Sequence, residues 1–325
     1  MRNPTVASEG PLTPRLGAIL EDVERGAARR VRRVLYRRRR TNLVSEVQMI
    51  DGQVLIVKQG TSEAARGRFA TAHAASILLR GVGIEMPATQ LLLNGEPVLV
   101  YRRIDRRTLH ECWPSASETG RLRLLESWGA LLHRLHSFEL RGVGPLADPA
   151  LRSADAGEYL RRDLAGRLIP ILETHLPQAV DIARTLAASV EALQAARSVV
   201  VHNDVFDQNV LCDDAACTGL LDFEDAFAGP PEADFAKLEL LHGPLFGQPW
   251  SGTWLEALRA GYEHTLDPRL VAAFRTLALL NMSWHGTTIG LADHSRMLVR
   301  AAAAEAARID EAILHTEAIR AAGLS

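Results

Sequence analysis

The stretch VVVHNDVFDQNVL, residues 199–211, constrains the fold of this chain more than any other segment. Three β-branched residues lead into a histidine, two carboxylates and three amides, and the chain turns apolar again at Val210. A surface loop needs no flanking apolar runs, and a core strand cannot hold Asp204 and Asp207 unless something offsets their charge. The pattern therefore predicts a loop that is held between two buried strands and directs polar groups at a ligand.

Length and composition limit the class of protein. The chain has 325 residues, enough for two domains or for one large domain with a cleft. No apolar run approaches the roughly 20 residues that span a bilayer, and the N-terminus lacks a secretory signal pattern. The three cysteines, Cys112, Cys212 and Cys217, form no CxxC pair, which argues against disulfides and a structural zinc site. We therefore expect a cytoplasmic protein without a membrane partner.

The basic residues are distributed unevenly. Residues 1–40 hold eleven arginines against four acidic residues, and such an arm can bind nucleic acid or a membrane surface. No recognised nucleic-acid-binding motif accompanies it, so we expect no nucleic-acid partner. Lys58 and Lys237 are the only two lysines, against thirty-five arginines. A lysine kept in such a composition is a candidate for a role that the wider guanidinium cannot fill.

Hydrophobic periodicity predicts an α+β chain with two unequal parts. In the first part we expect a loose tail over 1–15, helices over 16–28 and 63–80, and strands over 31–36, 42–50, 53–58 and 98–104. Asp51-Gly52 is typical of a hairpin turn. In the second part we expect helices over 117–138, 154–196 with breaks at Pro170 and Pro177, 232–242, 252–264, 267–284 and 293–319, and short strands over 198–202, 210–212 and 218–222. The predicted domains are 1–103 and 104–325, joined by a hinge at 99–105.

The opening segment carries residues that suit phosphoryl transfer. Asp204 and Asn209 lie five positions apart in the predicted loop, and Asp222 ends the apolar strand TGLLD. An Asn and an Asp together offer only oxygen ligands, which suit a hard cation such as Mg²⁺. Asp204 then stays free to accept a proton from a hydroxyl, and this division of roles is what phosphoryl transfer requires.

The same residues resemble a known superfamily. HNDVFDQN fits the pattern H-x-D-x-x-x-x-N, and LLDFED is similar to the element that follows it in the aminoglycoside phosphotransferase and choline kinase superfamily. Four further segments agree in order and spacing: VLIVK, VLVYRRIDRRTL, GALLHRLHSF and PPEADFAKL. The resemblance covers roughly residues 30–240. It implies a bilobal protein-kinase-like fold with a small β-rich N-lobe and a larger, mainly helical C-lobe.

The resemblance also implies roles for individual residues. Asp204 corresponds to the catalytic base, His202 and Asp234 to residues that brace the catalytic loop, and Asn209 and Asp222 to Mg²⁺ ligands. The co-substrate would be ATP, with GTP possible. The residues implied in nucleotide binding are Lys58 at the α- and β-phosphates and Val100, Arg102 and Ile104 at the hinge.

Two positions depart from the family pattern. His73 falls where the family usually has a glutamate that pairs with the lysine, so either that pair is weakened or Glu63 takes its place. The loop Arg37–Asn42 contains no glycine. One hypothesis is that its arginines, with Thr41 or Ser45, cover the phosphates directly, because guanidinium binds phosphate oxygens in a bidentate manner. The alternative is that the arginines simply alternate along an exposed hairpin.

The acceptor is the least constrained part. The carboxylates expected near the acceptor are Asp207, Glu224, Asp225, Glu232 and Glu239. They favour a cationic hydroxyl-bearing molecule such as an aminoglycoside-like antibiotic or an amino sugar. A choline- or ethanolamine-type kinase is the alternative if Trp250, Trp254 and Trp284 form a cage rather than pack in the core.

A regulatory nucleotide-binding pseudokinase is a further alternative. A protein kinase is disfavoured because no long activation segment follows Asp222. The oligomeric state is not predicted.

Overall fold

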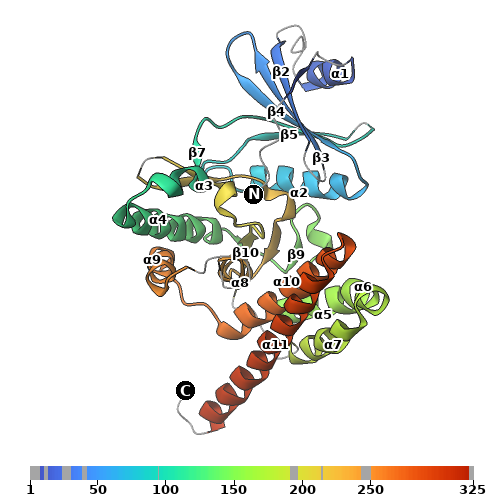
Figure 1. Cartoon of the computed structure of the whole chain (residues 1–325), viewed down its shortest axis with the longest axis vertical. Coiled ribbons are helices and arrows are strands. Elements are labelled where there is room, and N and C mark those ends of the chain that lie inside the picture. The colour runs from blue at the N-terminus through green and yellow to red at the C-terminus, as the bar shows by residue number, and fades with distance from the viewer. Residues whose placement is uncertain are drawn as a thin grey trace.

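The computed structural model describes residues 8–10, 14–23, 31–38, 42–93, 95–190, 197–213, 215–242 and 250–321. A β-rich lobe formed by the first hundred residues lies above a larger helical lobe, as Figure 1 shows. The long C-terminal helix crosses the helical lobe and packs against α10 (Pro268–Thr288), on the side away from the β-rich lobe. The predicted two-lobe α+β fold is therefore confirmed.

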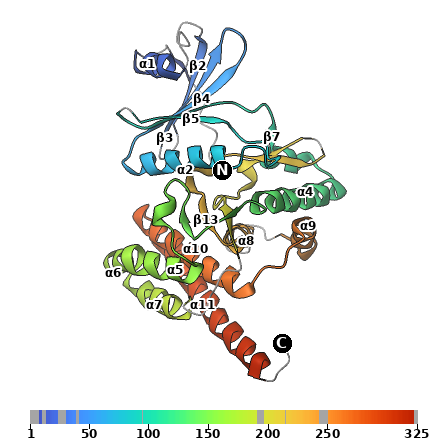
Figure 2. The same ribbon diagram turned by 180° about the vertical axis from the view of Figure 1, so that it is seen from behind.

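The N-lobe is built on one antiparallel sheet with the strand order β1-β2-β3-β4-β6-β5. The strands are β1 (Ser8–Gly10), β2 (Val31–Arg38), β3 (Asn42–Met49), β4 (Val54–Gly60), β5 (Thr89–Leu92) and β6 (Val98–Arg102). The predicted turn between β3 and β4 contains Gly52 with a φ of +88°, a conformation that glycine adopts without strain. Helix α1 (Pro14–Val23) and helix α2 (Ala64–Leu78) lie on opposite sides of the sheet (Figure 2).

The two faces of this sheet have different tasks. Leu16 and Leu20 of α1 pack with Val47, Val57 and Val100 in a small separate core. Successive side chains of a strand point to opposite faces, so the neighbours of these residues face α2 and the C-lobe. Val57 faces α1, so Lys58, the next residue of β4, faces the C-lobe.

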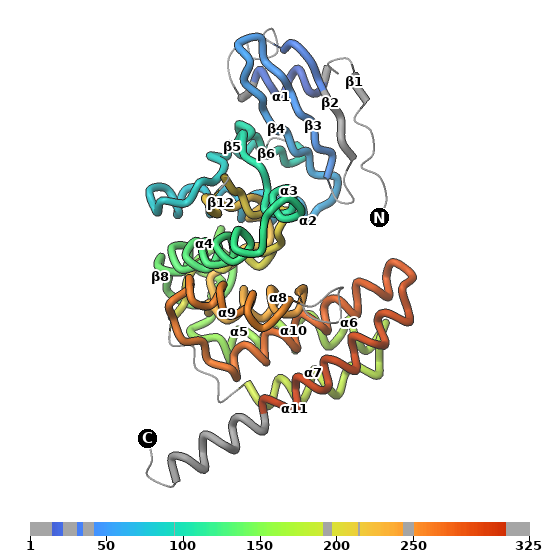
Figure 3. Tube along the Cα trace, turned by 60° about the vertical axis from the view of Figure 1, so that its left-hand side comes forward, coloured from blue at the N-terminus to red at the C-terminus, as the bar shows by residue number. Residues whose placement is uncertain are grey.

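The C-lobe is mainly helical. Its longer helices are α4 (Glu118–His136), α5 (Ala156–Asp163), α6 (Ile169–His175), α7 (Val180–Ser189), α8 (Glu232–Leu241), α9 (Gly252–Tyr262), α10 (Pro268–Thr288) and α11 (Ala292–Ala321). Helix α11 runs back along α10, and both lie beside α6 and α7 in the tube view of Figure 3. Ser117, the predicted N-cap of α4, accepts a hydrogen bond from the Gly120 N–H at 3.2 Å.

Two small antiparallel sheets hold the predicted catalytic loop and the segment that bears Asp222. One has the order β8-β10-β13-β9, and the other has the order β12-β11-β7. Their strands are β7 (Arg107–Thr108), β8 (Glu139–Leu140), β9 (Gly144–Pro145), β10 (Ser198–Val201), β11 (Val210–Cys212), β12 (Cys217–Leu220) and β13 (Phe227–Gly229). β7 follows the connection 103–106 out of β6 and pairs with β11, so the segment between the lobes is anchored on the C-lobe.

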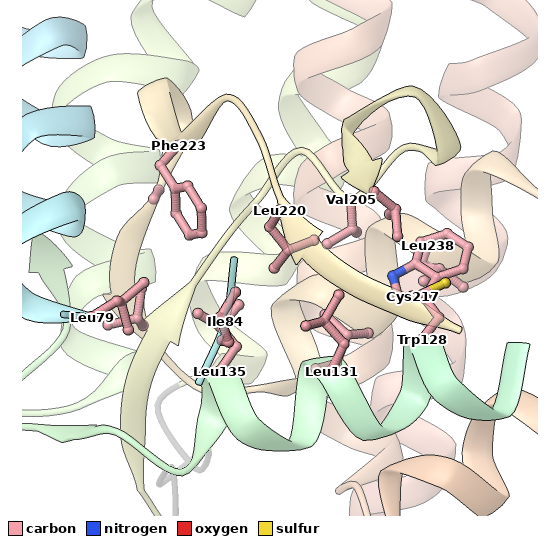
Figure 4. Close-up of a cluster of buried hydrophobic side chains, with 14 of the residues drawn as sticks. Leu79, Ile84, Trp128, Leu131, Leu135, Val205, Cys217, Leu220, Phe223 and Leu238 are labelled. Carbon is pink, nitrogen blue, oxygen red and sulfur yellow. The ribbon is translucent and has the colours of Figure 1, made fainter. Parts of the chain in front are cut away.

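The main C-lobe core lies directly beneath these strands. Figure 4 shows Trp128, Leu131 and Leu135 pointing from α4 toward the strand that bears Cys217 and Leu220. All five of these side chains are buried. The strands that flank the catalytic segment are therefore fixed from below by a rigid apolar helix face.

Two sequence predictions are wrong in detail. The helical backbone continues from α5 through a π-helical segment, Leu164–Leu168, into α6, without the predicted break at Pro170. Pro170 stands in the first turn of α6, where the missing N–H costs little. Part of the predicted loose tail is β1, which pairs with β2 at the sheet edge.

The strands β5, β7, β8, β9 and β13 have no counterpart among the predicted elements. Each is only two to four residues long, too short to show an alternating pattern. None of the described helices is long and apolar enough to cross a membrane.

We predict that Gly261→Ala strongly destabilises the fold. An added Cβ would lie 1.8 Å from the Glu126 carbonyl oxygen of α4, so α4 and α9 would have to separate. Overpacking of this kind typically costs about 1–3 kcal/mol. Urea unfolding should show the loss. Gly252→Ala in the same helix is the control, because nothing lies within 4 Å of its added Cβ. Equal stability of the two variants would contradict this close helix contact.

Candidate active site

The predicted catalytic loop leaves β10 at His202 and ends at Val210, where β11 of the other small sheet begins. Two backbone N–H groups at its start, those of His202 and Asn203, donate to the Asp234 carboxylate at 2.9 and 2.7 Å. Asn203 has a φ of +60°, which a non-glycine residue adopts only where surrounding contacts hold it. The Asp234 carboxylate supplies those contacts from the first turn of α8.

Asp234 is fully buried and is itself hydrogen-bonded to a deeper side chain. His136 of α4 contacts it through Nε2 at 3.1 Å, and the His136 Nδ1 contacts the Tyr262 hydroxyl at 2.9 Å. Burial alone would raise the pKa of Asp234, but the hydrogen bond from His136 and its charge hold that pKa below its ordinary value. Asp234 is therefore a fixed anion that braces the loop, in agreement with the role that the family resemblance implies.

The contacts of His202 define its tautomer. Its Nδ1 accepts from the Asp204 N–H at 3.2 Å, so the ring proton is on Nε2, which donates to the Leu221 carbonyl oxygen at 2.8 Å. The imidazole is neutral and fully buried. These bonds tie the catalytic loop to the segment that carries Asp222, which is a positioning role rather than a proton-transfer role.

Asp204 and Asn209 face each other across the loop. The Asn209 amide nitrogen donates to the Asp204 carboxylate at 2.8 Å and to the Asp204 carbonyl oxygen at 2.9 Å. Burial raises the pKa of Asp204, and the positive charge of Lys237 opposes that rise. Asp204 is thus a partly desolvated carboxylate of the kind that general bases require.

Asp222 lies beside this pair. β11 and β12 pair Val210 with Leu220, and the Leu221 N–H donates to the Asn209 carbonyl oxygen at 2.8 Å, so Asn209 and Asp222 come from adjacent chain segments. Asp222 has a φ of +65°, a second held left-handed residue. The Asn209 amide nitrogen is fully engaged with Asp204, which directs the amide oxygen away from Asp204. An amide oxygen and a carboxylate fit Mg²⁺. No cluster of three or more His, Cys, Asp or Glu suited to a metal occurs among the described residues.

Lys58 crosses from the N-lobe to this segment. Its Nζ donates to Asp222 Oδ1 at 2.9 Å and to Glu224 Oε1 at 2.6 Å. Burial would lower the pKa of Lys58, but the attraction of Tyr101, Asp222 and Glu224 raises it. Burial acts against ionised Asp222 too, yet the charge of Lys58 holds the pKa of Asp222 below its ordinary value. The lysine is therefore a permanent cation between two C-lobe carboxylates.

Glu224 holds together three parts of the N-lobe. Besides Lys58 it accepts from the Asn42 amide at 3.3 Å and lies 3.4 Å from the Arg68 guanidinium of α2. Arg68 also binds Asp225 at 2.9 Å. The helix α2 therefore contributes a cation to this site, and the loop after Asp222 contributes the anion that pairs with the lysine.

This arrangement corrects the expectation for α2. His73 contacts the Thr89 hydroxyl at 3.0 Å, and Glu63 is exposed at the start of the helix. The helix residue that lines the same narrow cavity as Lys58 is Ala72, which leaves no carboxylate on this turn. The lysine pair is not weakened, because Glu224 supplies the charge instead. Glu224 is 4% exposed, so we remove it from the acceptor residues.

Strand register corrects several nucleotide predictions. Ser45 pairs with Val57, so its side chain lies on the α1 face, where the hydroxyl is buried without a hydrogen-bond partner among the described residues. Leu99 and Tyr101 line the cavity beside Lys58, and the intervening Val100 packs on the α1 face.

The other predicted nucleotide contacts are less defined. By the same alternation the Arg102 side chain points away from Lys58, and Ile104 lies half-buried in the connection between the lobes. Only backbone atoms of this hinge remain candidates for contacting a base. Thr41, Arg39 and Arg40 lie outside the described residues, so the hypothesis that arginines cover the phosphates stays a prediction.

The carboxylates expected around an acceptor are dispersed. Asp207 contacts His110 at 2.9 Å, Glu232 is buried and accepts from the Asp267 N–H at 3.0 Å, and Glu239 is paired with arginines of α9 and α10. Of the five, Asp225 alone lines the cavity next to the catalytic loop. Asp207, Glu232 and Glu239 are each held by a partner from a distant element, while Glu224 and Asp225 share Arg68, so the five do not gather at one place.

The tryptophans form no cage around this cavity. Trp113 stacks on Trp250 at 6.1 Å and meets Trp254 edge-on at 5.0 Å, and Trp128 meets Trp250 at 5.8 Å. This cluster covers the end of α4. Trp284 lies on α10, partly buried against the other C-lobe core. All three tryptophans considered for a cage are packing residues.

Two functional candidates were missed as members of the site. Lys237 donates to the Asn203 carbonyl oxygen beside Asp204, and Arg68 binds Glu224 and Asp225. The rarity of lysine pointed to Lys237, although not to its place. Nothing in the sequence around Arg68 indicates a role in the site, because it is one of thirty-five arginines.

No curated protein sequence matches this chain closely enough to count as a relative. Aminoglycoside phosphotransferase APH(2")-IIa in complex with gentamicin is similar in structure, with a TM-score of 0.63 at 16% identity over 91% of this chain and 96% of that one. A thermostable mutant of aminoglycoside phosphotransferase APH(4)-Ia, in a ternary complex with AMP-PNP and hygromycin B, gives a TM-score of 0.67 at 14% identity over 90% and 98%.

A third structure, ADP-bound aminoglycoside phosphotransferase APH(2'')-Ib, gives a TM-score of 0.62 at 16% identity over 90% of this chain and 99% of that one. At these identities the structures establish the kinase-like fold. The phosphotransferase enzyme family, APH, matches residues 36–275, which include both lobes and every residue of the site described above. This chain belongs to the phosphotransferase enzyme family.

Proposed function

We propose that the protein is a small-molecule kinase that transfers the γ-phosphoryl group of ATP or GTP to a hydroxyl group. The observation that carries this proposal is the pairing of Asp204 with Asn209 at 2.8 Å in a braced loop, beside Asp222 and Lys58. Phosphoryl transfer depends on positioning and on charge stabilisation, and a site with a rigid carboxylate, an oxygen-only metal set and a buried cation meets both needs.

Each residue then has a defined task. The acceptor oxygen attacks the γ-phosphorus, the bond to the bridging oxygen of the β-phosphate breaks, and the nucleoside diphosphate leaves. Asp204 orients the hydroxyl and takes its proton. Lys58, released from Asp222, contacts the α- and β-phosphates, while Glu224 keeps it in place. Magnesium held by Asn209 and Asp222 would neutralise charge on the β- and γ-phosphates.

The class of acceptor stays open in this proposal. A cationic acceptor, such as an aminoglycoside-like antibiotic or an amino sugar, was expected because five carboxylates were assigned to its pocket. Four of those carboxylates lie elsewhere, and the tryptophans that would favour a choline-type kinase pack together. The sequence-based reasons for a cationic acceptor and for a choline-type acceptor therefore both fail.

The first test combines nucleotide binding with turnover. ATP·Mg²⁺ at about a hundred times its Kd should stabilise the protein by roughly 2.7 kcal/mol in thermal unfolding. Asp222→Asn should lose this shift. Asp204→Asn should keep the shift but lose slow ADP release with water as the acceptor, because the base acts on the acceptor rather than on the nucleotide. A parallel titration with GTP·Mg²⁺ decides the nucleotide.

A shift without any ADP release in the natural chain would instead support the regulatory pseudokinase. No shift with either nucleotide would contradict the kinase proposal as a whole.

We predict that Glu224→Gln weakens ATP binding about tenfold, since a charged partner of the buried lysine is worth 1–2 kcal/mol. The KM for ATP in the hydrolysis assay should rise, and thermal stability without nucleotide should fall as well, because buried Lys58 and Arg68 lose an anionic partner. Glu63→Gln on the exposed start of α2 is the matched control and should leave KM unchanged. If Glu63→Gln raised KM and Glu224→Gln did not, the assignment of the lysine partner would be wrong.

The pH dependence should report Asp204. Its pKa is raised by burial, and Lys237 opposes the rise, so the base form is lost as pH falls through that raised pKa. Removing the opposing charge in Lys237→Met should raise the pKa further and move the acid limb of the hydrolysis rate to higher pH. Arg259→Met removes a cation paired with Glu239 and should leave the limb in place. An acid limb that moves to lower pH in Lys237→Met would contradict this coupling.

A further inference from the structure

A cavity of about 390 Å³ adjoins the catalytic loop on its C-lobe side. Asn203, Asp225 and Lys237 form the wall nearest Asp204, and α5 and α10 close the far side. This is a volume that suits a small organic molecule. The residues that line this cavity therefore determine the shape and charge of an acceptor that can reach Asp204.

Three aromatic side chains run through the cavity. The Tyr159 and Phe227 rings are stacked with centroids 5.8 Å apart and an interplanar angle of 14°, and Phe227 and Phe274 are 6.3 Å apart at 28°. A second cavity of about 380 Å³ adjoins the first through Tyr159 and Phe227. Burial raises the pKa of Tyr159 to about 12, so its hydroxyl is neutral. This aromatic row lines the cavity with apolar ring surface rather than with charge.

The carboxylates of the cavity are already neutralised. Both oxygens of Asp163 bind Arg167 at 2.6 Å, and Arg167 also donates to the Asn281 amide oxygen at 3.0 Å. Asp225 is paired with Arg68 at 2.9 Å. A cationic ligand would have to displace an arginine from either carboxylate before gaining an ion pair of its own.

Lys237 is a cation of this wall, and among the described residues no carboxylate lies at ion-pair distance from it. Its ammonium group donates to the Asn203 carbonyl oxygen, and its positive charge acts on Asp204, whose pKa it lowers against the effect of burial. A positive ligand group placed near Asp204 is therefore repelled by Lys237, and this repulsion offsets the attraction of the Asp204 carboxylate. The same ammonium would attract a neutral hydroxyl or an anionic group.

We infer that the acceptor carries a flat apolar or aromatic ring face and no net positive charge. The ring face would lie on the Tyr159–Phe227–Phe274 row, and a hydroxyl would point past Lys237 to Asp204. The inference rests on the proposed function and names the class of its acceptor. That class is a hydroxylated molecule that is neutral or acidic, as opposed to a polyamine.

Three glycosides test the inference. Phenyl glucoside has the ring face and no charge, methyl glucoside has the same hydroxyl groups without the ring, and phenyl glucosaminide carries an amine in place of the 2-hydroxyl. Gentamicin is the polycation for comparison. Isothermal titration of each into the full chain with AMP-PNP·Mg²⁺ gives affinities, and mass spectrometry after incubation with ATP·Mg²⁺ shows which probe gains phosphate.

Phenyl glucoside should bind about tenfold more tightly than either methyl glucoside or phenyl glucosaminide. Gentamicin should bind more weakly still. Phe227→Leu should remove most of the advantage of the phenyl ring, and Lys237→Met should raise the affinity for the aminated probe toward that of its neutral counterpart. Both variants should keep the affinity for AMP-PNP·Mg²⁺, which reports an intact fold.

Tighter binding of gentamicin or phenyl glucosaminide than of phenyl glucoside would overturn the inference, as would the absence of saturable binding by phenyl glucoside. Failure of the proposed function has a different signature. In that case AMP-PNP·Mg²⁺ would not bind, while phenyl glucoside would still bind with the expected preference and would support the inferred pocket chemistry by itself.

Discussion

The two lobes are held in register by one buried lysine shared between two carboxylates. Lys58 stands on β4 of the N-lobe, and Asp222 and Glu224 flank a single residue of the C-lobe. Desolvating three charged groups is costly, and only close contacts offset that cost. The cluster therefore fixes where the sheet sits over the catalytic loop. Arg68 adds a second link from α2 to the same loop.

The catalytic loop depends on a second buried anion. Asp234 holds two consecutive N–H groups of the loop, and His136 and Tyr262 hold Asp234 from the core. Both oxygens of Asp234 are satisfied, and the left-handed backbone at Asn203 is held further by Lys237, which donates to the Asn203 carbonyl oxygen, and by the Asn203 amide, which donates to the Asp225 carbonyl oxygen. The position of Asp204 therefore depends on a chain of hydrogen bonds that begins at His136 in α4, 98 residues before Asp234.

Features of the fold and the site that depend on neighbouring residues could be predicted from the sequence, whereas contacts between distant segments could not. The hairpin at Gly52, the loop between β10 and β11 and the cap at Ser117 depend on neighbouring residues, and the sequence predicts them. Strand alternation also predicts that Ser45 and Val100 face away from Lys58, an inference that the motif alone does not supply. The partner of Lys58 could not be predicted, because His73, Ala72 and Glu224 are distinguished only by how α2 packs on the C-lobe.

The residues expected around the acceptor were also mispredicted because their partners come from distant segments. Counting carboxylates near a motif assumes that their charges are free, whereas Asp207, Glu232 and Glu239 each bind a partner supplied by a distant element. The cavity beside Asp204 is assembled from α5, β13, α8 and α10. Its carboxylates Asp163 and Asp225 are each paired with an arginine, and Lys237 acts on Asp204. In a chain whose lysines are nearly all replaced by arginine, both remaining lysines lie at the site. Under the proposed function Lys58 would face the nucleotide and Lys237 the acceptor. The ammonium of Lys58 donates to two carboxylates and that of Lys237 to a backbone carbonyl oxygen, contacts that suit a compact point charge.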